Sequence, residues 1–97
     1  MKIFGRDKLV EYGKRHADAK SALDSWYHET SSENCQWKTP QDIKIRYASA
    51  SFLTNNKVIF NIKGNNHRLV VAVFYQNGTA VIEWIGTHAE YDKKKFT

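Results

Sequence analysis

Two short segments of this chain carry the side chains best suited to acid–base chemistry at a phosphate. Residues 86–93 (Gly-Thr-His-Ala-Glu-Tyr-Asp-Lys) place an imidazole, a phenol, a carboxylate and an ammonium just after an apolar stretch. Residues 60–69 bring a lysine, several amides, a second histidine and Arg68. If the fold brings these segments together, proton carriers lie beside fixed cations. That combination suits cleavage of a phosphodiester backbone.

Three residues are the catalytic candidates. Arg68 is the first choice for a phosphate clamp, because a guanidinium makes two bonds to one phosphate and stays charged; its alternative is a surface salt bridge with Glu83. His88 is the candidate proton carrier, because an imidazole titrates near neutrality, although a lone histidine is more often structural. Tyr91 either orients the substrate, stacks on a base or exchanges a proton, or it is a core aromatic under the last strand.

Other polar residues are candidates for binding a polyanion. The expected substrate contacts are lysines and amides: Lys57, Asn61, Lys63, Asn65, Lys93 and Lys94. Lys95 extends the last two into a basic tail. For Asn65 a role in shaping the turn is favoured over base contact. Asp92 either orients His88 or caps a short final helix, and the cap is favoured. The remaining histidines, His16, His28 and His67, are expected to be bystanders.

The composition bounds the class of protein. The chain has 97 residues, 41% of them apolar, which predicts one globular domain over residues 1–97. Fifteen Lys and Arg against ten Asp and Glu give a net charge of +5, which favours partners such as RNA, DNA or an acidic protein. The single Cys35 forms no internal disulfide and fits a reducing cytosol. No leader or membrane span is recognisable, so a cytoplasmic protein is expected.

No cofactor is expected. The sequence has no pair of His or Cys at the spacing of metal ligands, and it has one cysteine. The segment around Gly64 is too short for a glycine-rich nucleotide loop. We therefore predict a site without metal.

The first half of the chain predicts helices. Residues 1–4 suit an edge strand, and residues 6–15 suit a short amphipathic helix. Asp18 is the expected N-cap of a second helix that ends near residues 31–34. Thr39-Pro40 opens a brief helix, because proline is favoured at the first helical position. Residues 47–56 are expected to form a loop. Trp26 and Trp84 are expected in the core, and Trp37 at the surface.

The second half predicts strands at residues 58–62, 69–75 and 80–85. Asn77-Gly78 is a strong two-residue hairpin turn, because both residues tolerate positive φ. The expected fold class is α+β: a small twisted antiparallel sheet of three strands in a meander, with residues 1–4 as a possible fourth strand, and the N-terminal helices on one face.

The two expected turns predict the faces of this sheet. The Asn77-Gly78 turn pairs Val71 with Trp84 on the core face and Arg68 with Thr87 on the open face. A four-residue loop at residues 64–67 then pairs Lys63 with Arg68, Asn61 with Val70 and Lys57 with Phe74. The open face therefore collects four polar side chains that form a platform for phosphate: Lys57, Asn61, Lys63 and Arg68.

Strict alternation would place His88 on the core face, away from Arg68. Either a bulge at Gly86 re-aims the end of the strand, or the chain has already turned by residue 88. The sequence leaves both alternatives open.

These segments resemble a known family. Residues 61–65 (Asn-Ile-Lys-Gly-Asn), 68–71 (Arg-Leu-Val-Val) and 86–92 are similar to the HigB toxins of bacterial toxin–antitoxin systems, within the RelE-like superfamily. The resemblance extends from about residue 60 to 95. It implies an mRNA interferase that cleaves message on translating ribosomes. It also implies neutralisation by a HigA-like helix-turn-helix antitoxin, with operator DNA bound only through that antitoxin.

Two interpretations compete with an RNA-cleaving toxin. One is a non-catalytic module that binds RNA or the ribosome with the same basic face. The other is a protein-interaction domain whose basic surface docks an acidic partner. The cluster of His88, Tyr91 and Lys93 favours the enzyme, because binding alone does not require a titratable imidazole.

Overall fold

The computed structural model describes residues 1–94, so Lys95 of the basic tail lies outside the described part. Its centre is a five-stranded sheet in the order β1-β5-β4-β3-β2. The strands are β1 Lys2–Phe4, β2 Ser51–Phe52, β3 Lys57–Ile62, β4 His67–Phe74 and β5 Thr79–Thr87. All neighbouring strands are antiparallel except β1 and β5, which run parallel.

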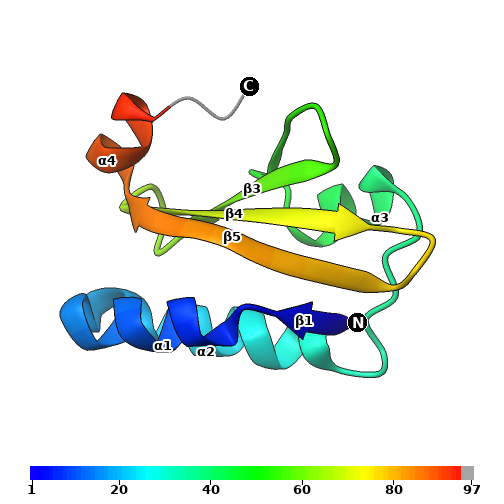
Figure 1. Cartoon of the computed structure of the whole chain (residues 1–97), viewed down its shortest axis with the longest axis horizontal. Helices are drawn as coiled ribbons and strands as arrows, with labels where there is room; N and C mark the ends of the chain where they lie inside the picture. Colours follow the sequence, from blue (N-terminus) through cyan, green and yellow to red (C-terminus); the bar gives the residue numbers. More distant parts are fainter. Residues whose placement is uncertain (95–97) are drawn as a thin grey trace.

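Four helices complete the described chain: α1 Arg6–Arg15, α2 Ala17–Ser31, α3 Pro40–Arg46 and α4 His88–Lys93. Figure 1 shows α1 and α2 side by side beneath one face of the sheet, and α4 rising from the end of β5 on the other side. The predicted α+β class is confirmed. The expected three or four strands were too few, because Ser51–Phe52 forms a short strand inside the segment expected to be a loop.

The core lies between the sheet and the helices. Its largest fully buried side chains come from α1, α2, α3 and three central strands: Tyr12, Leu23, Ile43, Phe60, Leu69 and Ile82. Trp26 is buried there as expected. Trp37 is buried too, 5% exposed and stacked on Phe60, so its predicted surface position was wrong. An aromatic ring buried in this core stabilises the fold more than the same ring would at the surface.

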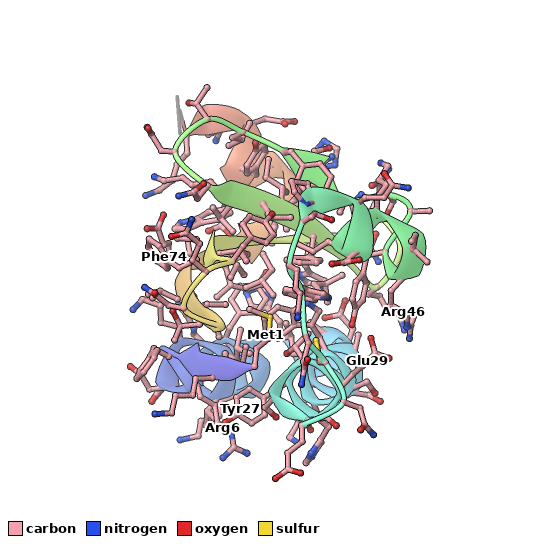
Figure 2. All side chains as sticks on the ribbon, turned by 90° about the vertical axis from the view of Figure 1, so that its right-hand side faces the viewer. Met1, Arg6, Tyr27, Glu29, Arg46 and Phe74 are labelled. Carbon is pink, nitrogen blue, oxygen red and sulfur yellow. The ribbon has the colours of Figure 1, made fainter. Side chains whose placement is uncertain are left out.

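Side chains near the C-terminal ends of α2 and α3 connect the two helices. Two nitrogens of Arg46 donate to one carboxylate oxygen of Glu29, at 3.0 and 2.7 Å, and the Tyr47 hydroxyl donates to the other oxygen. Figure 2 shows Glu29 and Arg46 at one side of the molecule, with Phe74 at the opposite side. The same view shows Arg6 beside Tyr27, whose ring centroid is 4.7 Å from the guanidinium carbon.

The start of α2 differs from the prediction. His16, not Asp18, occupies the N-cap position, and Asp18 lies in the first helical turn. The Asp18 carboxylate instead accepts a hydrogen bond from His67 at 2.8 Å. The Asp18 carboxylate is therefore bonded to His67, which is remote in sequence, instead of capping its own helix. The α3 start follows the prediction, with Pro40 at the first helical position after Thr39.

The β3–β4 hairpin has the predicted faces but a different register. The connecting loop is residues 63–66 instead of 64–67, and Lys63 has a positive φ of 54°. Asn61 therefore pairs with Arg68, and Lys57 pairs with Ala72. A shift by two residues leaves every side chain on its own face. Val58, Phe60 and Ile62 accordingly face the core, where all three are buried.

The β4–β5 turn is longer than predicted. The strands end at Phe74 and resume at Thr79, and only Gly78, with φ 66°, takes a positive φ in this turn. The Asn77 N–H donates to the Phe74 carbonyl at 3.1 Å. This geometry is a four-residue turn followed by a left-handed glycine, so the predicted two-residue turn was wrong. Phe74 pairs with Thr79, again a shift of two that preserves the faces.

A β-bulge in the middle of β5 changes the faces beyond it. Val71 pairs with Ile82, but Val70 pairs with Trp84, so Glu83 is the extra residue. From that point the alternation is inverted, and Trp84 lies on the open face, which corrects its predicted core position. A bulge at Gly86 was one of the two alternatives for this strand end. The observed bulge lies three residues earlier, at Glu83. Arg68 now faces Gly86 instead of Thr87.

Candidate functional site

Arg68 and His88 meet on the open face of the sheet, at the end where β5 leads into α4. Arg68 Nη2 lies 3.4 Å from His88 Nδ1, although the two residues are far apart in sequence. Arg68 is partly buried, and the His88 side chain is 43% exposed. A guanidinium and an imidazole that share one solvent-accessible edge can both reach a single phosphate group.

His88 reaches this position because the chain has turned before it. Thr87 is the N-cap of α4: its hydroxyl accepts from the Glu90 N–H at 3.1 Å, and the Glu90 carboxylate accepts from the Thr87 N–H at 2.8 Å. This capping box starts the helix at His88, whose own N–H donates to the Asn66 carbonyl at 3.0 Å. Both alternatives for His88 contribute: the chain turns before it, and a bulge re-aims the strand, at Glu83 instead of Gly86.

The two ring nitrogens of His88 have different surroundings. Nε2 lies 3.1 Å from the Asp92 carboxylate, one helical turn away. Nδ1 faces both Arg68 and, at 3.3 Å, the Asn65 carbonyl. In the neutral form, an Nε2–H donates to Asp92 and Nδ1 accepts from Arg68; in the cationic form, an Nδ1–H donates to Asn65. The expected role of Asp92 as a helix cap was wrong, and it orients the imidazole.

Aromatic rings support Arg68 from below. The guanidinium carbon lies 5.1 Å from the centre of the Tyr91 ring, and the Tyr91 and Trp84 ring centroids are 6.1 Å apart. Trp84 lies over Gly86, where a Cβ atom would come within 2.4 Å of the indole. Tyr91 is partly exposed on the open side. It is therefore not the buried core aromatic that was its alternative, and it forms a cation–π platform for Arg68.

The polar candidates on β3 have protein partners. Lys57 forms an ion pair with Glu83 at 3.1 Å, so Glu83 is not the partner of Arg68. The Asn61 amide nitrogen donates to the Ser49 carbonyl at 3.2 Å. Among residues 1–94, the side-chain amide oxygen Oδ1 of Asn61 and Nε of Arg68 are buried without a hydrogen-bond partner. Asn61 thus lies directly opposite Arg68 in the ladder, while Lys57 lies four residues further along the sheet.

The remaining candidates lie in the β3–β4 loop and at the end of α4. Lys63 and Asn65 are exposed in the β3–β4 loop, and Asn65 contacts His88 through its backbone, not its side chain. Lys93 is exposed in the last turn of α4. The Lys94 ammonium lies 5.7 Å from the centre of the Trp84 ring. Asn61 and Asn65 therefore adjoin the Arg68–His88 pair, whereas Lys63 lines a hollow with Glu29 of α2 and Arg46 of α3.

Sequence reasoning missed two contributors to this site. The first is Trp84, whose position depends on the bulge. Its place two residues before Gly86 could have indicated that it lies on the open face, because a large aromatic ring often covers a glycine in a strand. The second is the pair of carbonyls of Asn65 and Asn66, which no side-chain pattern reveals. His67 is also no loop bystander: it lies in β4 and is 3% exposed.

Within residues 1–94, no group of three or more His, Cys, Asp and Glu side chains is arranged to hold a metal ion. No helix in that part of the chain has the length and apolar character needed to cross a bilayer.

Comparison with known proteins gives the class. Residues 19–94 match the family of HigB toxins, described as the RelE-like toxic component of a toxin–antitoxin system, and the chain belongs to this family. Its sheet with helices on one face is consistent with the RelE-like fold. Among individual proteins, the chain is similar to the mRNA interferase HigB of Escherichia coli O6:H1. The two are 25% identical over 95 residues, which cover 96% of this chain and 90% of the relative.

Proposed function

We propose that this chain is a ribosome-associated mRNA endoribonuclease that cleaves by attack of the ribose 2′-hydroxyl, with acid–base catalysis by its own side chains and without a metal. The observation that carries the proposal is the 3.4 Å approach of Arg68 and His88 on one exposed face. Membership of the toxin family and similarity to an mRNA interferase support the choice of RNA as substrate.

The first chemical step is deprotonation of the 2′-hydroxyl. In the neutral imidazole, Nδ1 carries the lone pair and faces the phosphate position beside Arg68. His88 Nδ1 takes the proton as the 2′-oxygen forms its bond to phosphorus. The resulting imidazolium is held by Asp92 and the Asn65 carbonyl. General base catalysis of this kind contributes roughly 10² to 10⁴ in rate.

The second step expels the 5′-oxygen. The P–O5′ bond breaks, the departing oxygen takes a proton, and the products are a 2′,3′-cyclic phosphate and a 5′-hydroxyl. Arg68 stabilises the additional negative charge of the phosphorane, and the Tyr91 ring beneath it holds the guanidinium in place. Tyr91 and Lys93 are the candidate proton donors, since both lie on α4 with His88.

The surrounding cations and amides position the message. Lys63, Lys93 and Lys94 contact phosphates on either side of the scissile linkage, and Asn61 and Asn65 contact the adjacent nucleotide. Lys57 is the most distant contact and exchanges its ion pair with Glu83 for a phosphate. The partners of the protein are mRNA on the ribosome and a HigA-like helix-turn-helix antitoxin, through which the pair binds operator DNA. The chain acts in the cytoplasm.

Cleavage of message after brief induction tests the proposal. Primer extension should reveal new 5′ ends within translated regions, and purified protein should cut ribosome-bound message in the presence of excess chelator. Complete inhibition by the chelator would contradict the metal-free mechanism. Absence of new ends despite growth arrest would contradict nuclease activity altogether.

Two variants separate catalysis from binding. Arg68→Ala should abolish growth inhibition with the fold intact, and a fully toxic variant would remove Arg68 from the mechanism. His88→Gln should lower the cleavage rate by about 10² or more while ribosome binding changes little. Equal losses of cleavage and binding would instead support a non-catalytic RNA- or ribosome-binding module.

A further inference from the structure

A second set of hydrogen-bonded side chains lies on the core face of β4, beneath the proposed catalytic pair. The Asp18 carboxylate is 2.8 Å from His67 Nε2, and His67 Nδ1 is 2.7 Å from the Tyr12 hydroxyl. His67 is 3% exposed and Tyr12 is 2% exposed. The ring of His16 stacks on Tyr12 with centroids 4.1 Å apart. The network joins α1, α2 and β4.

The Asp18 carboxylate fixes one proton of His67. A carboxylate is an acceptor, so Nε2–H donates to Asp18. When the ring is neutral, Nδ1 accepts from the Tyr12 hydroxyl. The bond from His67 lowers the pKa of Asp18, which stays a carboxylate. Burial raises the pKa of Tyr12 to about 12, so its hydroxyl keeps its proton. Tyr12 has no access to substrate, and the network is therefore not a nucleophilic triad.

The network is connected to the open face through the backbone. His67 precedes Arg68, and its ladder partner Thr87 precedes His88. The two residues before His67 supply carbonyls to His88: Asn65 to the ring at 3.3 Å and Asn66 to the backbone N–H at 3.0 Å. The strand end that the network holds thus carries one catalytic candidate and positions the other.

We infer that Asp18, His67 and Tyr12 are positioning residues, which hold the start of β4 in place so that Arg68 and His88 share one phosphate. The inference rests on the proposed function for its catalytic readout. It assigns a role to helices α1 and α2, whose other contribution is to the core. Rigid support of this kind matters because a displacement of about 1 Å at the chemistry can cost 10²-fold in rate.

The substitutions that break the network have distinct effects. Tyr12→Phe leaves His67 Nδ1 buried without a donor, and His67→Leu removes both bonds. Asp18→Asn is the conservative variant, because its amide oxygen still accepts from Nε2–H. We expect kcat for ribosome-bound message to fall about 10- to 100-fold in Tyr12→Phe and His67→Leu. We expect Asp18→Asn to stay much closer to wild type.

Matched residues on α2 provide the controls. Tyr27→Phe, Asp24→Asn and His28→Gln make comparable chemical changes outside the network, and each should retain the wild-type rate. KM should change little in the network variants, since they leave the open-face cations untouched. Wild-type kcat in folded Tyr12→Phe and His67→Leu would overturn the inference. So would a loss that disappears when the rate is divided by the folded fraction.

A measurement without activity tests the geometry directly. In ¹⁵N spectra, His67 should carry a proton on Nε2, and Tyr12→Phe should shift the ring signals of His88 as well as those of His67. Unchanged His88 signals in that variant would overturn the inference. If the wild type cuts no RNA, the proposed function fails, whereas the spectra still decide whether the network positions His88.

Discussion

At the scale of single residues, His88 is suited to proton transfer because its Nδ1 has a different partner in each protonation state. Asp92 holds Nε2 in both states, while Nδ1 accepts from Arg68 when neutral and donates to Asn65 when charged. A proton can therefore be taken up and released without movement of the ring. Because Asp92 is a partner in both states, its role can be tested without changing the ring itself.

Asp92 should matter for rate more than for fold. Asp92→Ala leaves Nε2 without its carboxylate, and partners of this type commonly contribute about 10- to 100-fold to the residues that they orient. We expect kcat to fall by that factor in single-turnover cleavage of ribosome-bound message. The control is Glu33→Ala, which removes an exposed carboxylate far from α4. Equal activity of the two variants would show that Asp92 does not orient His88.

Gly86 should tolerate no side chain. A Cβ atom there would lie 2.4 Å from the Trp84 indole, so Gly86→Ala must displace the ring that packs against Tyr91. We expect a loss of about 1–3 kcal/mol in unfolding free energy and a marked loss of cleavage. Gly13→Ala in α1 is the matched control, since its Cβ would meet Lys20 at 3.4 Å. That helical glycine should gain about 0.5–1 kcal/mol with full activity. An active Gly86→Ala variant would contradict the stacking argument.

At the scale of elements, the short helix α4 carries four of the proposed site residues: His88, Tyr91, Asp92 and Lys93. Such a helix has little stability of its own and depends on its cap. The Thr87–Glu90 capping box thus has a direct influence on the site, although neither side chain touches substrate in the proposed mechanism.

The two capping boxes within residues 1–94 offer a matched comparison. Thr87→Ala in α4 and Thr39→Ala in α3 should each cost about 1 kcal/mol of stability in urea denaturation. Only Thr87→Ala should reduce cleavage, because the start of α4 positions His88. Equal activity in the two variants would indicate that α4 is held by packing and not by its cap.

The Glu90 carboxylate predicts a dependence on pH. The bond from the Thr87 N–H lowers the pKa of Glu90 below its ordinary 4.5. A carboxylate with a lowered folded pKa stabilises the fold above its unfolded pKa, and this contribution is lost as the pH falls through the folded value. The difference in unfolding free energy between wild type and Glu90→Gln should therefore shrink as the pH falls from neutral to below 4.5. A constant difference would contradict the assigned role of this carboxylate.

At the scale of the whole molecule, the sheet separates two functions. One face packs on α1 and α2 and carries the core, while the end of the other face carries Arg68 and His88 (Figure 1). The net charge is +5, and exposed lysines lie on α1 and α2 as well as in the β3–β4 loop and at the end of α4. Position, not total charge, should therefore decide how RNA binds.

Two sets of lysine substitutions test this point. Replacing Lys63, Lys93 and Lys94 by Gln should weaken RNA binding and reduce the slope of log affinity against log salt by roughly 2, at about 0.7 per phosphate contact. Replacing Lys8, Lys14 and Lys20 on α1 and α2 removes the same charge from the other side and should leave the slope nearly unchanged. Equal effects in a filter-binding titration would show that only net charge matters.

Much of the architecture could be predicted because it depends on local patterns. Alternation of apolar and polar residues along β3 and β4 predicted their faces, and Thr39-Pro40 predicted the start of α3. The turn at Asn77-Gly78 was predicted in place but not in length. Asp18 was misassigned, because its partner His67 is remote in sequence and competes with the local cap.

The sequence by itself determined the types of groups available and the faces of β3 and β4, because side-chain alternation follows from backbone geometry alone. Only the tertiary structure decided that Arg68 and His88 meet. That contact depends on the bulge at Glu83, the stacking of Trp84 over Gly86 and the carbonyls of the β3–β4 loop. Each of these is a non-local packing or backbone interaction, and no periodic pattern in the sequence predicts it.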